Sequence, residues 1–457
     1  MSPDIKVDIG RARSAAVTAA HGVSPAELKA IGPRVDEGHD ALKEDRARKR
    51  QGFYDLYKDK ATLSEVKKSA RAFVAEGYEN FVVLGIGGSA LGISTLVRAL
   101  KPSYYNLLSA DRRQGRPRVF VMDNVDPETF GAMLELCPPE KTLFNVISKS
   151  GGTAETVSQL LIVLERLEKS LGKAAVKRHL VVTTGPSSAR GAKSPLQHVK
   201  TTYGLEGFSV PTNIGGRYSV FSPVGMFPAA VLGIDVDALA AGCRAMDRRT
   251  SKPSLQENPA YLRAAVHYIL SEGKGKSIAV MMPYSDRLRD VADWHRQLWA
   301  ESLGKQNSLN GNKALRCRAQ TPVTALGVTD QHSQLQLYLE GPNDKVITIL
   351  EQSTFERSLK IPNFPSGKGG VGYLGAKTMN RLIASERKAT ADVLRDAGRP
   401  VIRITLPQVN EHAMGQLLYM LEVETAMAGR LFNVNAFDQP AVESIKVLAR
   451  KYMGGKV

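Results

Sequence analysis

The sequence predicts an α/β fold built on two doubly wound parallel sheets, with a helical N-terminal arm before them and a C-terminal helix after them. In each half of the chain, short apolar runs of strand length alternate with longer stretches of helical periodicity, a pattern typical of parallel sheets covered by helices. The runs are apolar throughout, as expected of strands buried on both faces. We divide the 457 residues into a helical segment packing on the second domain (1–75), a first α/β domain (76–250) and a second (251–457).

The first half begins with helical patterns and continues with alternating strands and helices. A charged stretch (36–50) is expected to form an exposed arm or helix, and Thr62 or Ser64 would cap a further helix over 62–76. Strands are predicted at 81–86, 118–122, 142–147 and 180–184. A helix follows the first strand, another covers 156–171, and residues 185–215 are expected to be mostly loop.

The second half repeats this architecture after a short polar junction at 248–253. Strands are predicted at 277–282, 345–350 and 401–405, and helices at 259–271, 285–304, 331–339, 376–397 and 411–429. The Pro- and Gly-rich residues 361–370 predict an irregular loop. Asp438 is a candidate N-cap of a final helix, whose apolar stripe is Val442, Ile445, Leu448, Ala449 and Tyr452.

Composition narrows the class of protein. Hydrophobic residues make up 43% and charged residues 23% of the chain, as in globular proteins. No apolar run reaches the roughly 18 residues of a membrane span, and the N-terminus shows no signal-peptide pattern. Cys137, Cys243 and Cys317 are far apart and match no metal-binding spacing. We therefore expect reduced packing thiols in a cytoplasmic protein.

The net charge of +17 favours anionic partners. Nucleic acid is one such partner, but the Lys and Arg residues are spread along the chain and no nucleic-acid-binding motif is evident. A sugar phosphate accounts for the charge equally well. We expect such a small-molecule substrate, without a nucleic-acid or membrane partner.

Two loops rich in Gly and Ser follow predicted strands of the first half. One covers residues 85–89 (Gly-Ile-Gly-Gly-Ser), with Gly88 and Ser89, and the other covers 148–153 (Ser-Lys-Ser-Gly-Gly-Thr). Glycines let backbone N–H groups approach an anion, and the helix that follows adds positive potential. The second loop also offers hydroxyls and a cation; its candidate ligands are Ser148, Lys149, Ser150 and Thr153. Neither loop has a nucleotide-binding signature, so a phosphomonoester fits best.

A carboxylate in the second half is a candidate general base. The predicted helix 285–304 follows an apolar strand, and Gln297 and Glu301 are four residues apart, so they share one helix face. The apolar stripe lies on a different face. The helix dipole disfavours a carboxylate in the last turn, which makes Glu301 suited to proton transfer.

Three cationic or titratable residues are further candidates. Arg217 follows Gly215-Gly216, where a guanidinium beside flexible backbone could stabilise an oxyanion. His332 lies at a predicted helix start and is a natural acid or base. Lys446 lies at the margin of the last helix's apolar stripe. Each of these residues taken alone is more often structural or solvated.

The motifs together resemble one family. In order they are 85–89, 148–153, 215–219 (Gly-Gly-Arg-Tyr-Ser), 301–305 (Glu-Ser-Leu-Gly-Lys), 330–332 (Asp-Gln-His), and Phe437-Asp438-Gln439 with Val442-Glu443 and Lys446. This series is similar to that of the glucose-6-phosphate isomerases, shorter bacterial form, from about residue 80 onward. The resemblance implies two sugar-isomerase-type (SIS) domains and interconversion of glucose 6-phosphate and fructose 6-phosphate in glycolysis and gluconeogenesis.

The resemblance also implies a role for each motif. Glu301 would move the proton between C1 and C2 through a cis-enediol, and Arg217 would stabilise the enediolate. His332 and Lys446 would serve ring opening and binding, with the histidine supplied by the other subunit of a homodimer. The remaining residues would bind substrate: Gly88, Ser89, Ser148, Lys149, Ser150, Thr153, Gln297 and Gln439. No cofactor or metal is implied.

Two departures and two alternatives remain at this stage. Ala441 stands where the family usually has Gly, so its Cβ could shift the last helix, and Ser150-Gly151-Gly152 replaces a loop that is Thr-rich in many members. One alternative is a bifunctional isomerase that also accepts mannose 6-phosphate. The other is a sugar-phosphate sensor without catalysis, which would not need Glu301, Arg217 and His332 together.

Overall fold

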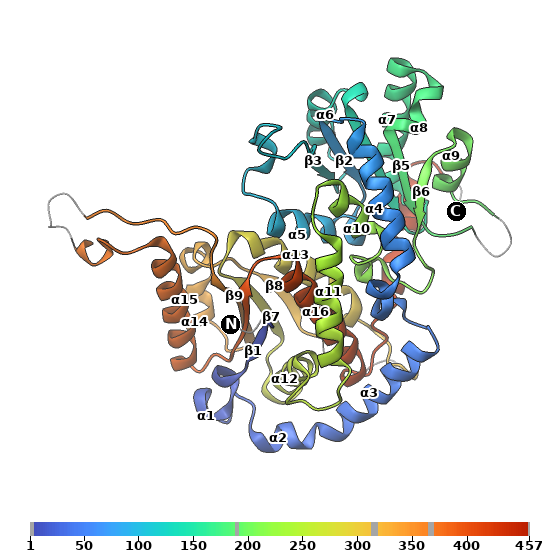
Figure 1. Cartoon of the computed structure of the whole chain (residues 1–457). Helices are drawn as coiled ribbons and strands as arrows, with labels where there is room; N and C mark the ends of the chain where they lie inside the picture. The colour runs from blue at the N-terminus through green and yellow to red at the C-terminus, as the bar shows by residue number, and fades with distance from the viewer. Residues whose placement is uncertain (1–3, 188–191, 312–318, 364–369, 456–457) are drawn as a thin grey trace.

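The computed structural model contains two parallel sheets joined by a bundle of long helices (Figure 1). It describes residues 4–187, 192–311, 319–363 and 370–455. The first sheet has the strand order β3-β2-β4-β5-β6, with every pair parallel. Its strands are β2 (Asn80–Leu84), β3 (Arg118–Met122), β4 (Thr142–Ser148), β5 (Leu180–Thr184) and β6 (Glu206–Ser209).

The second sheet has the strand order β1-β10-β9-β7-β8 and is parallel except at one edge. Its strands are β1 (Lys6–Asp8), β7 (Ile278–Pro283), β8 (Thr321–Thr324), β9 (Lys345–Thr354) and β10 (Val401–Gln408). Each predicted strand is present, so the α/β class with two parallel sheets is confirmed.

Helices surround both sheets. In the N-terminal region they are α1 (Ser14–Val17), α2 (Pro25–Ala30), α3 (Gly32–Ala47) and α4 (Lys60–Ala75). Around the first sheet and after it lie α5 (Leu91–Leu100), α6 (Pro127–Leu136), α7 (Ala154–Leu171), α8 (Val176–His179), α9 (Pro195–Tyr203), α10 (Pro223–Val231) and α11 (Val236–Thr250). The rest are α12 (Pro259–Lys274), α13 (Arg289–Leu303), α14 (Leu335–Glu340), α15 (Met379–Asp396), α16 (Glu411–Leu431) and α17 (Glu443–Tyr452).

Helix α16 lies at the centre of the core. Almost all of its residues are buried, and it packs against α11 and α12 and also contacts α3, α5 and α13 (Figure 1). A helix that is buried on nearly all sides is expected only where other elements surround it. The main hydrophobic core therefore runs continuously from the first sheet through α16 to the second. Smaller clusters lie under α6 and α7 and under α14 and α15.

The sequence pattern missed some elements and misplaced two helix caps. Within residues 185–215, α9 and β6 stand between loops, and β8 is a strand that the sequence pattern does not predict. The side chain of Asp59, rather than Thr62 or Ser64, caps α4 by accepting from the Thr62 N–H at 3.0 Å. Asp438 caps no helix, because a 3-10 turn (Pro440–Val442) separates it from α17.

Some predictions fall partly outside the residues that the structure describes. Cys317 is one, and residues 364–369 of the predicted loop are another. Cys137 and Cys243 are buried free thiols. In the described part of the chain, no helix is both long and apolar enough to cross a membrane, and no group of three or more His, Cys, Asp or Glu could hold a metal ion.

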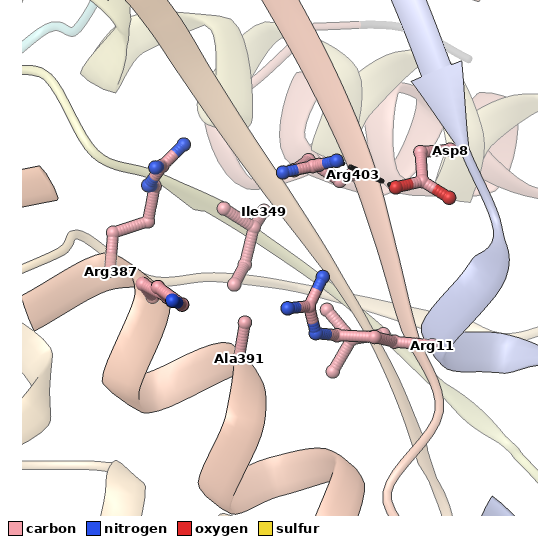
Figure 2. A pocket seen from close by; sticks show the side chains of 8 residues that line it. Asp8, Arg11, Ile349, Arg387, Ala391 and Arg403 are labelled. Carbon is pink, nitrogen blue, oxygen red and sulfur yellow. Dashed lines mark hydrogen bonds and ion pairs between the residues drawn. The ribbon is translucent and has the colours of Figure 1, made fainter. Parts of the chain in front are cut away.

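The N-terminal segment contacts both halves of the molecule. Strand β1 extends the second sheet by pairing antiparallel with β10, and Asp8 there accepts from Arg403 at 2.7 Å. Arg11 donates to Asp392 of α15 at 2.7 Å. Asp8, Arg11 and Arg403 line a cavity of about 120 Å³ over Ile349 (Figure 2). Helix α4 instead packs on α10, so the segment covers more than the second half alone. The domain boundaries stay a prediction.

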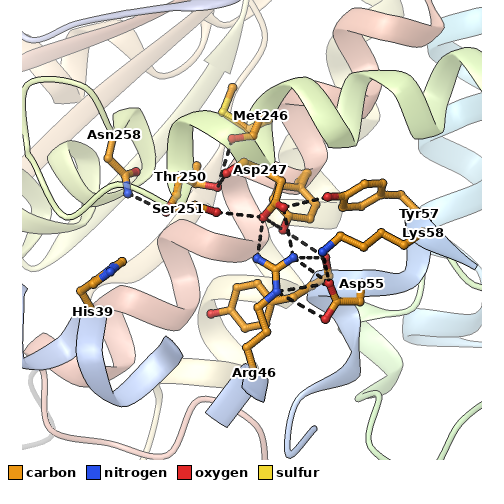
Figure 3. Close-up of polar contacts among 12 residues, drawn as sticks. His39, Arg46, Asp55, Tyr57, Lys58, Met246, Asp247, Thr250, Ser251 and Asn258 are labelled. Carbon is orange, nitrogen blue, oxygen red and sulfur yellow. Dashed lines mark hydrogen bonds and ion pairs between the residues drawn. The ribbon is translucent and has the colours of Figure 1, made fainter. Parts of the chain in front are cut away.

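A second ion-pair network fixes the end of α3 to the core (Figure 3). Arg46 donates to Asp247 of α11 at 2.7 and 3.0 Å and to Asp55 at 2.7 Å. Asp247 also accepts from Tyr57 at 2.7 Å and from Tyr419 of α16 at 2.6 Å. The charged stretch 36–50 is therefore helical up to Ala47 but not exposed throughout.

The hydrogen bonds of this network set the pKa of Asp247. Burial alone would raise that pKa, but hydrogen bonds from Arg46, Tyr419 and Tyr57 outweigh it, so the pKa lies below the ordinary value of 3.8. A carboxylate whose pKa is lower in the folded state stabilises the fold above its unfolded pKa. The stabilisation is lost as the pH falls through the folded value.

We expect Asp247→Asn to lower the free energy of unfolding at pH 7 by about 3 kcal/mol, because it leaves the Arg46 charge incompletely paired. The variant should also lose less stability than the wild type between about pH 5 and pH 3. Denaturant unfolding at several pH values measures both effects. Asp40→Asn, an exposed change on α3 away from this network, is the control. Equal acid dependence in Asp247→Asn and the wild type would contradict the assignment.

Candidate active site

The two Gly/Ser loops lie side by side at the carboxyl edge of the first sheet. They follow β2 and β4, which are neighbouring parallel strands, so their ends meet at the same edge. In the second loop the Ser148 and Thr153 hydroxyls are 2.8 Å apart, and each lies 3.4 Å from the Ser150 hydroxyl. Thr153 directly precedes α7. The loop therefore presents three clustered hydroxyls at a helix N-terminus, as predicted.

Lys149 of this loop is half-buried and faces positive charge. Its ammonium donates to the Thr212 carbonyl at 3.0 Å. Burial, and after it the nearby Arg217, lower the pKa of Lys149. A lysine in this setting gains more from an added anion than an exposed lysine does, because the anion compensates both effects.

The first loop touches the Arg217 segment. A Cβ built on Gly88 would lie 2.2 Å from the Gly216 carbonyl oxygen and 2.7 Å from the Arg217 nitrogen. Only glycine fits where two backbones approach this closely. Gly87, which has φ +58°, faces Gln297, whose amide nitrogen would be 3.0 Å from an added Cβ. Ser89 is half-buried in the same 3-10 turn (Gly87–Ser89).

Every N–H-bearing nitrogen of the buried Arg217 guanidinium has an acceptor. Nε donates to the Ser302 hydroxyl at 2.7 Å. Nη2 donates to the Ala436 and Asp438 carbonyls at 2.6 and 3.0 Å. Nη1 donates to Glu301 at 3.2 Å and to Gln439 at 3.0 Å. The side chain of Arg217 is only 1% exposed, so this pairing compensates for the desolvation of its charge.

Helix α13 places Glu301 against Arg217. Its buried face includes Trp294, Leu298 and Trp299, which packs the helix into the core and turns the Gln297–Glu301 face toward the loops. Glu301 Oε2 accepts from the Gln297 amide at 3.0 Å, while Oε1 faces Arg217. The Glu301 side chain remains 28% exposed, so the carboxylate is held by two donors and still open to a ligand.

Two residues of the site had no assigned role at the sequence level. Ser302 accepts from Arg217 and lies 3.2 Å from the Tyr218 hydroxyl. Lys305 donates to the Glu301 carbonyl at 2.7 Å and pairs with Asp438 at 3.3 Å. Burial, followed by Arg217, lowers the pKa of Lys305. The available signal was the position of Lys305 in the sequence, four residues after Glu301, although α13 ends at Leu303 and Lys305 lies just beyond it.

Two of the predicted residues, His332 and Lys446, lie apart from this cluster within one chain. His332 is at the surface in a 3-10 turn (Thr329–His332) that follows the second sheet's strand β8. Lys446 is exposed on α17, where it pairs with Glu443 at 2.6 Å. Ala441 has no left-handed backbone conformation, so its Cβ is tolerated in the turn before α17. Gln439 is brought to Arg217, as described above.

Comparison with known proteins identifies the family. The model of the family described as phosphoglucose isomerase matches residues 58–454. The chain belongs to the phosphoglucose isomerase family. It is 46% identical over 416 residues to the glucose-6-phosphate isomerase of Carboxydothermus hydrogenoformans, covering 91% of this chain and 87% of the relative. The family is one of aldose–ketose isomerases, and the enzyme class expected from the motifs is confirmed.

Solved structures agree on the fold of this phosphoglucose isomerase family member. A hypothetical protein from Thermus thermophilus superposes with a TM-score of 0.84 and 35% identity, covering 99% of this chain and 100% of that one. A glucose-6-phosphate isomerase from Chlamydia trachomatis gives a TM-score of 0.71 at 24% identity, covering 86% and 73% of the two chains. The second likeness concerns the fold alone. The two-sheet α/β architecture is thereby confirmed.

We expect Gly88→Ala to lower kcat/KM at least about 100-fold, because the new Cβ would push the Arg217 backbone away from its position in the site. Steady-state kinetics, coupled to oxidation of glucose 6-phosphate, measures the loss. Gly131→Ala is the matched control, since a Cβ there meets nothing within 4 Å and alanine favours the helix. A Gly88→Ala enzyme with wild-type kcat/KM would show that the close approach does not matter for activity.

Proposed function

We propose that this chain catalyses the reversible isomerisation of glucose 6-phosphate and fructose 6-phosphate. The observation that carries the proposal is the Glu301 carboxylate, held between Arg217 and Gln297 and still accessible, beside a hydroxyl-lined loop that ends with a helix N-terminus. Family membership gives the reaction class. The geometry supports the roles of a base, an oxyanion stabiliser and a phosphate anchor, which an aldose–ketose shift requires.

The phosphate group is proposed to bind the loop 148–153. The hydroxyls of Ser148, Ser150 and Thr153 would donate to its oxygens, together with backbone N–H groups and Lys149. Gly88 and Ser89 of the first loop would lie beside the bound phosphate. Binding energy from the phosphate, which does not react, orients the sugar carbons for the chemical step.

Glu301 is proposed to carry the proton. It would take the proton from C2 of the open-chain aldose and return it to C1, passing through a cis-enediol intermediate. Negative charge that develops on the enediolate oxygens would be stabilised by Arg217. Nη1 is the nitrogen suited to this contact. It donates to the side chains of Glu301 and Gln439, whereas Nη2 donates to backbone carbonyls. The proposed proton transfer uses side chains alone.

A homodimer is proposed to complete the site. His332 is at the surface and lies apart from the Arg217 cluster in its own chain, which supports its donation to the neighbouring subunit's site for ring opening. Lys446 would contribute to binding from α17. We place the enzyme in the cytoplasm, in glycolysis and gluconeogenesis. No observation favours the sensor, for which a paired Glu301 and Arg217 would have no purpose.

We expect Glu301→Gln to lower kcat by about 100-fold or more, because the amide cannot accept the C2 proton. The dissociation constant of a non-reacting sugar phosphate should change little. Coupled kinetics and calorimetric titration measure the two quantities. Glu135→Gln, an exposed change on α6, is the control. Wild-type turnover by Glu301→Gln would remove this mechanism.

For Lys149→Ala we expect mainly weaker binding, with KM and the inhibition constant of inorganic phosphate raised about tenfold, because one charge-assisted contact is lost. Inhibition by phosphate isolates this contact from the sugar. Lys177→Ala, an exposed change on α8, is the control. An unchanged phosphate inhibition constant would contradict the phosphate-site assignment.

The shared site predicts complementation between two inactive variants. Mixed dimers of Glu301→Gln and His332→Ala chains contain one site with both residues intact, if His332 comes from the partner. We expect co-refolded mixtures to recover activity that neither parent shows, at up to about half of the wild-type activity per mixed dimer. Absence of recovery in verified mixed dimers would place His332 in the site of its own chain.

A further inference from the structure

We propose that residues 49–57, here called the strap, position Arg217 and Lys149, two of the cations of the site, through two separate contacts. The proposal rests on the proposed function, because it takes Arg217 and Lys149 as the groups that act on the substrate. The strap joins α3 to α4 and itself lies outside the site. Its role is inferred from what it touches.

The first contact is aromatic and joins the strap to the residues around Arg217. Phe53 is 1% exposed, and its ring centre lies 4.8 Å from that of Tyr218 and 6.2 Å from that of Phe437. The Tyr218 and Phe437 rings are themselves 5.4 Å apart. Ring pairs at these separations are attractive and have preferred geometry. Phe53 therefore buttresses both rings at once.

These two rings belong to the chain segments that hold the guanidinium. Tyr218 directly follows Arg217, and its hydroxyl lies 3.2 Å from Ser302, the acceptor of Arg217 Nε. Phe437 stands between Ala436 and Asp438, whose carbonyls accept from Nη2. A shift of Phe53 would therefore move the donor and its acceptors relative to each other.

The second contact is polar and joins the strap to the loop that holds Lys149. The Gly52 N–H donates to the Asn213 carbonyl at 3.0 Å, and the Asn213 side-chain amide donates to the Lys49 carbonyl at 2.8 Å. The residue before Asn213, Thr212, offers the carbonyl that accepts from Lys149. The strap and this loop approach so closely that a Cβ on Gly52 would lie 2.7 Å from the Asn213 side chain.

The strap is held rigidly at its own ends, as a positioning element must be. At one end Asp45 pairs with Arg50 at 2.8 Å and with Arg430 of α16. At the other, the Arg46 network described above binds Asp55 and Tyr57 (Figure 3). Both anchors include residues of the central helices α11 and α16, which form much of the core.

Because the two contacts act on different groups, their removal should affect different kinetic constants. Phe53→Leu keeps an apolar side chain but loses the ring contacts. We expect kcat to fall about tenfold or more, with the inhibition constant of inorganic phosphate within about twofold of wild type. Asn213→Ala should do the reverse: the phosphate constant rises about threefold or more, and kcat stays within about twofold.

The control for Phe53→Leu is Phe73→Leu, which removes another buried ring, one that packs on Phe227 away from the site. Both variants should lose thermal stability, but only Phe53→Leu should lose kcat. An equal fall of kcat in both, or no fall in Phe53→Leu, would overturn the aromatic contact. An unchanged phosphate constant in Asn213→Ala would overturn the polar one.

The same measurements separate this inference from the proposed function. If Glu301→Gln is inactive and Lys149→Ala binds phosphate weakly while both strap variants behave as wild type, the strap inference fails alone. If Glu301→Gln keeps its activity, the proposed function fails first, and the strap inference fails with it.

Discussion

The arrangement of the site depends on the complete pairing of one buried cation. Arg217 directs its N–H groups to Ser302 and Glu301 of α13, to Gln439, and to two carbonyls of residues 436–438. A buried guanidinium that lost an acceptor would carry an uncompensated desolvation cost of several kcal/mol. Three segments far apart in the sequence must therefore keep their mutual positions, and Glu301 is fixed as a result.

Arg217 also has an electrostatic effect on its neighbours. Burial lowers the pKa of both Lys149 and Lys305, and the nearby Arg217 lowers it further. A region that disfavours further positive charge attracts an anion, and its effect is strong because the groups are partly shielded from water. The net charge of +17 gives a general attraction for anions, whereas the local cluster decides where on the molecule an anion would be held.

The sequence allowed the sheets and much of the site to be predicted because the signals are local. Buried parallel strands are continuous apolar runs, and residues 85–89 and 148–153 follow such runs directly. Short or weakly patterned elements were missed for the same reason. Strand β8, with the sequence Thr-Pro-Val-Thr, lies at a sheet edge and has no long apolar run. Asp438 likewise contacts Arg217 and Lys305 rather than capping α17, and these partners are far from it in the sequence.

The sequence by itself therefore determined the fold class, the family resemblance and the identity of the residues proposed to carry the chemistry. Only the tertiary structure decided which of them meet within one chain: Arg217, Glu301, Gln297 and Gln439 do, and His332 and Lys446 do not. It also gave roles to Ser302 and Lys305 and connected Phe53 to Tyr218. The physical reason is that periodicity and turn chemistry act over a few residues, whereas hydrogen-bond pairing of a buried charge and packing of rings join residues that are far apart in the chain.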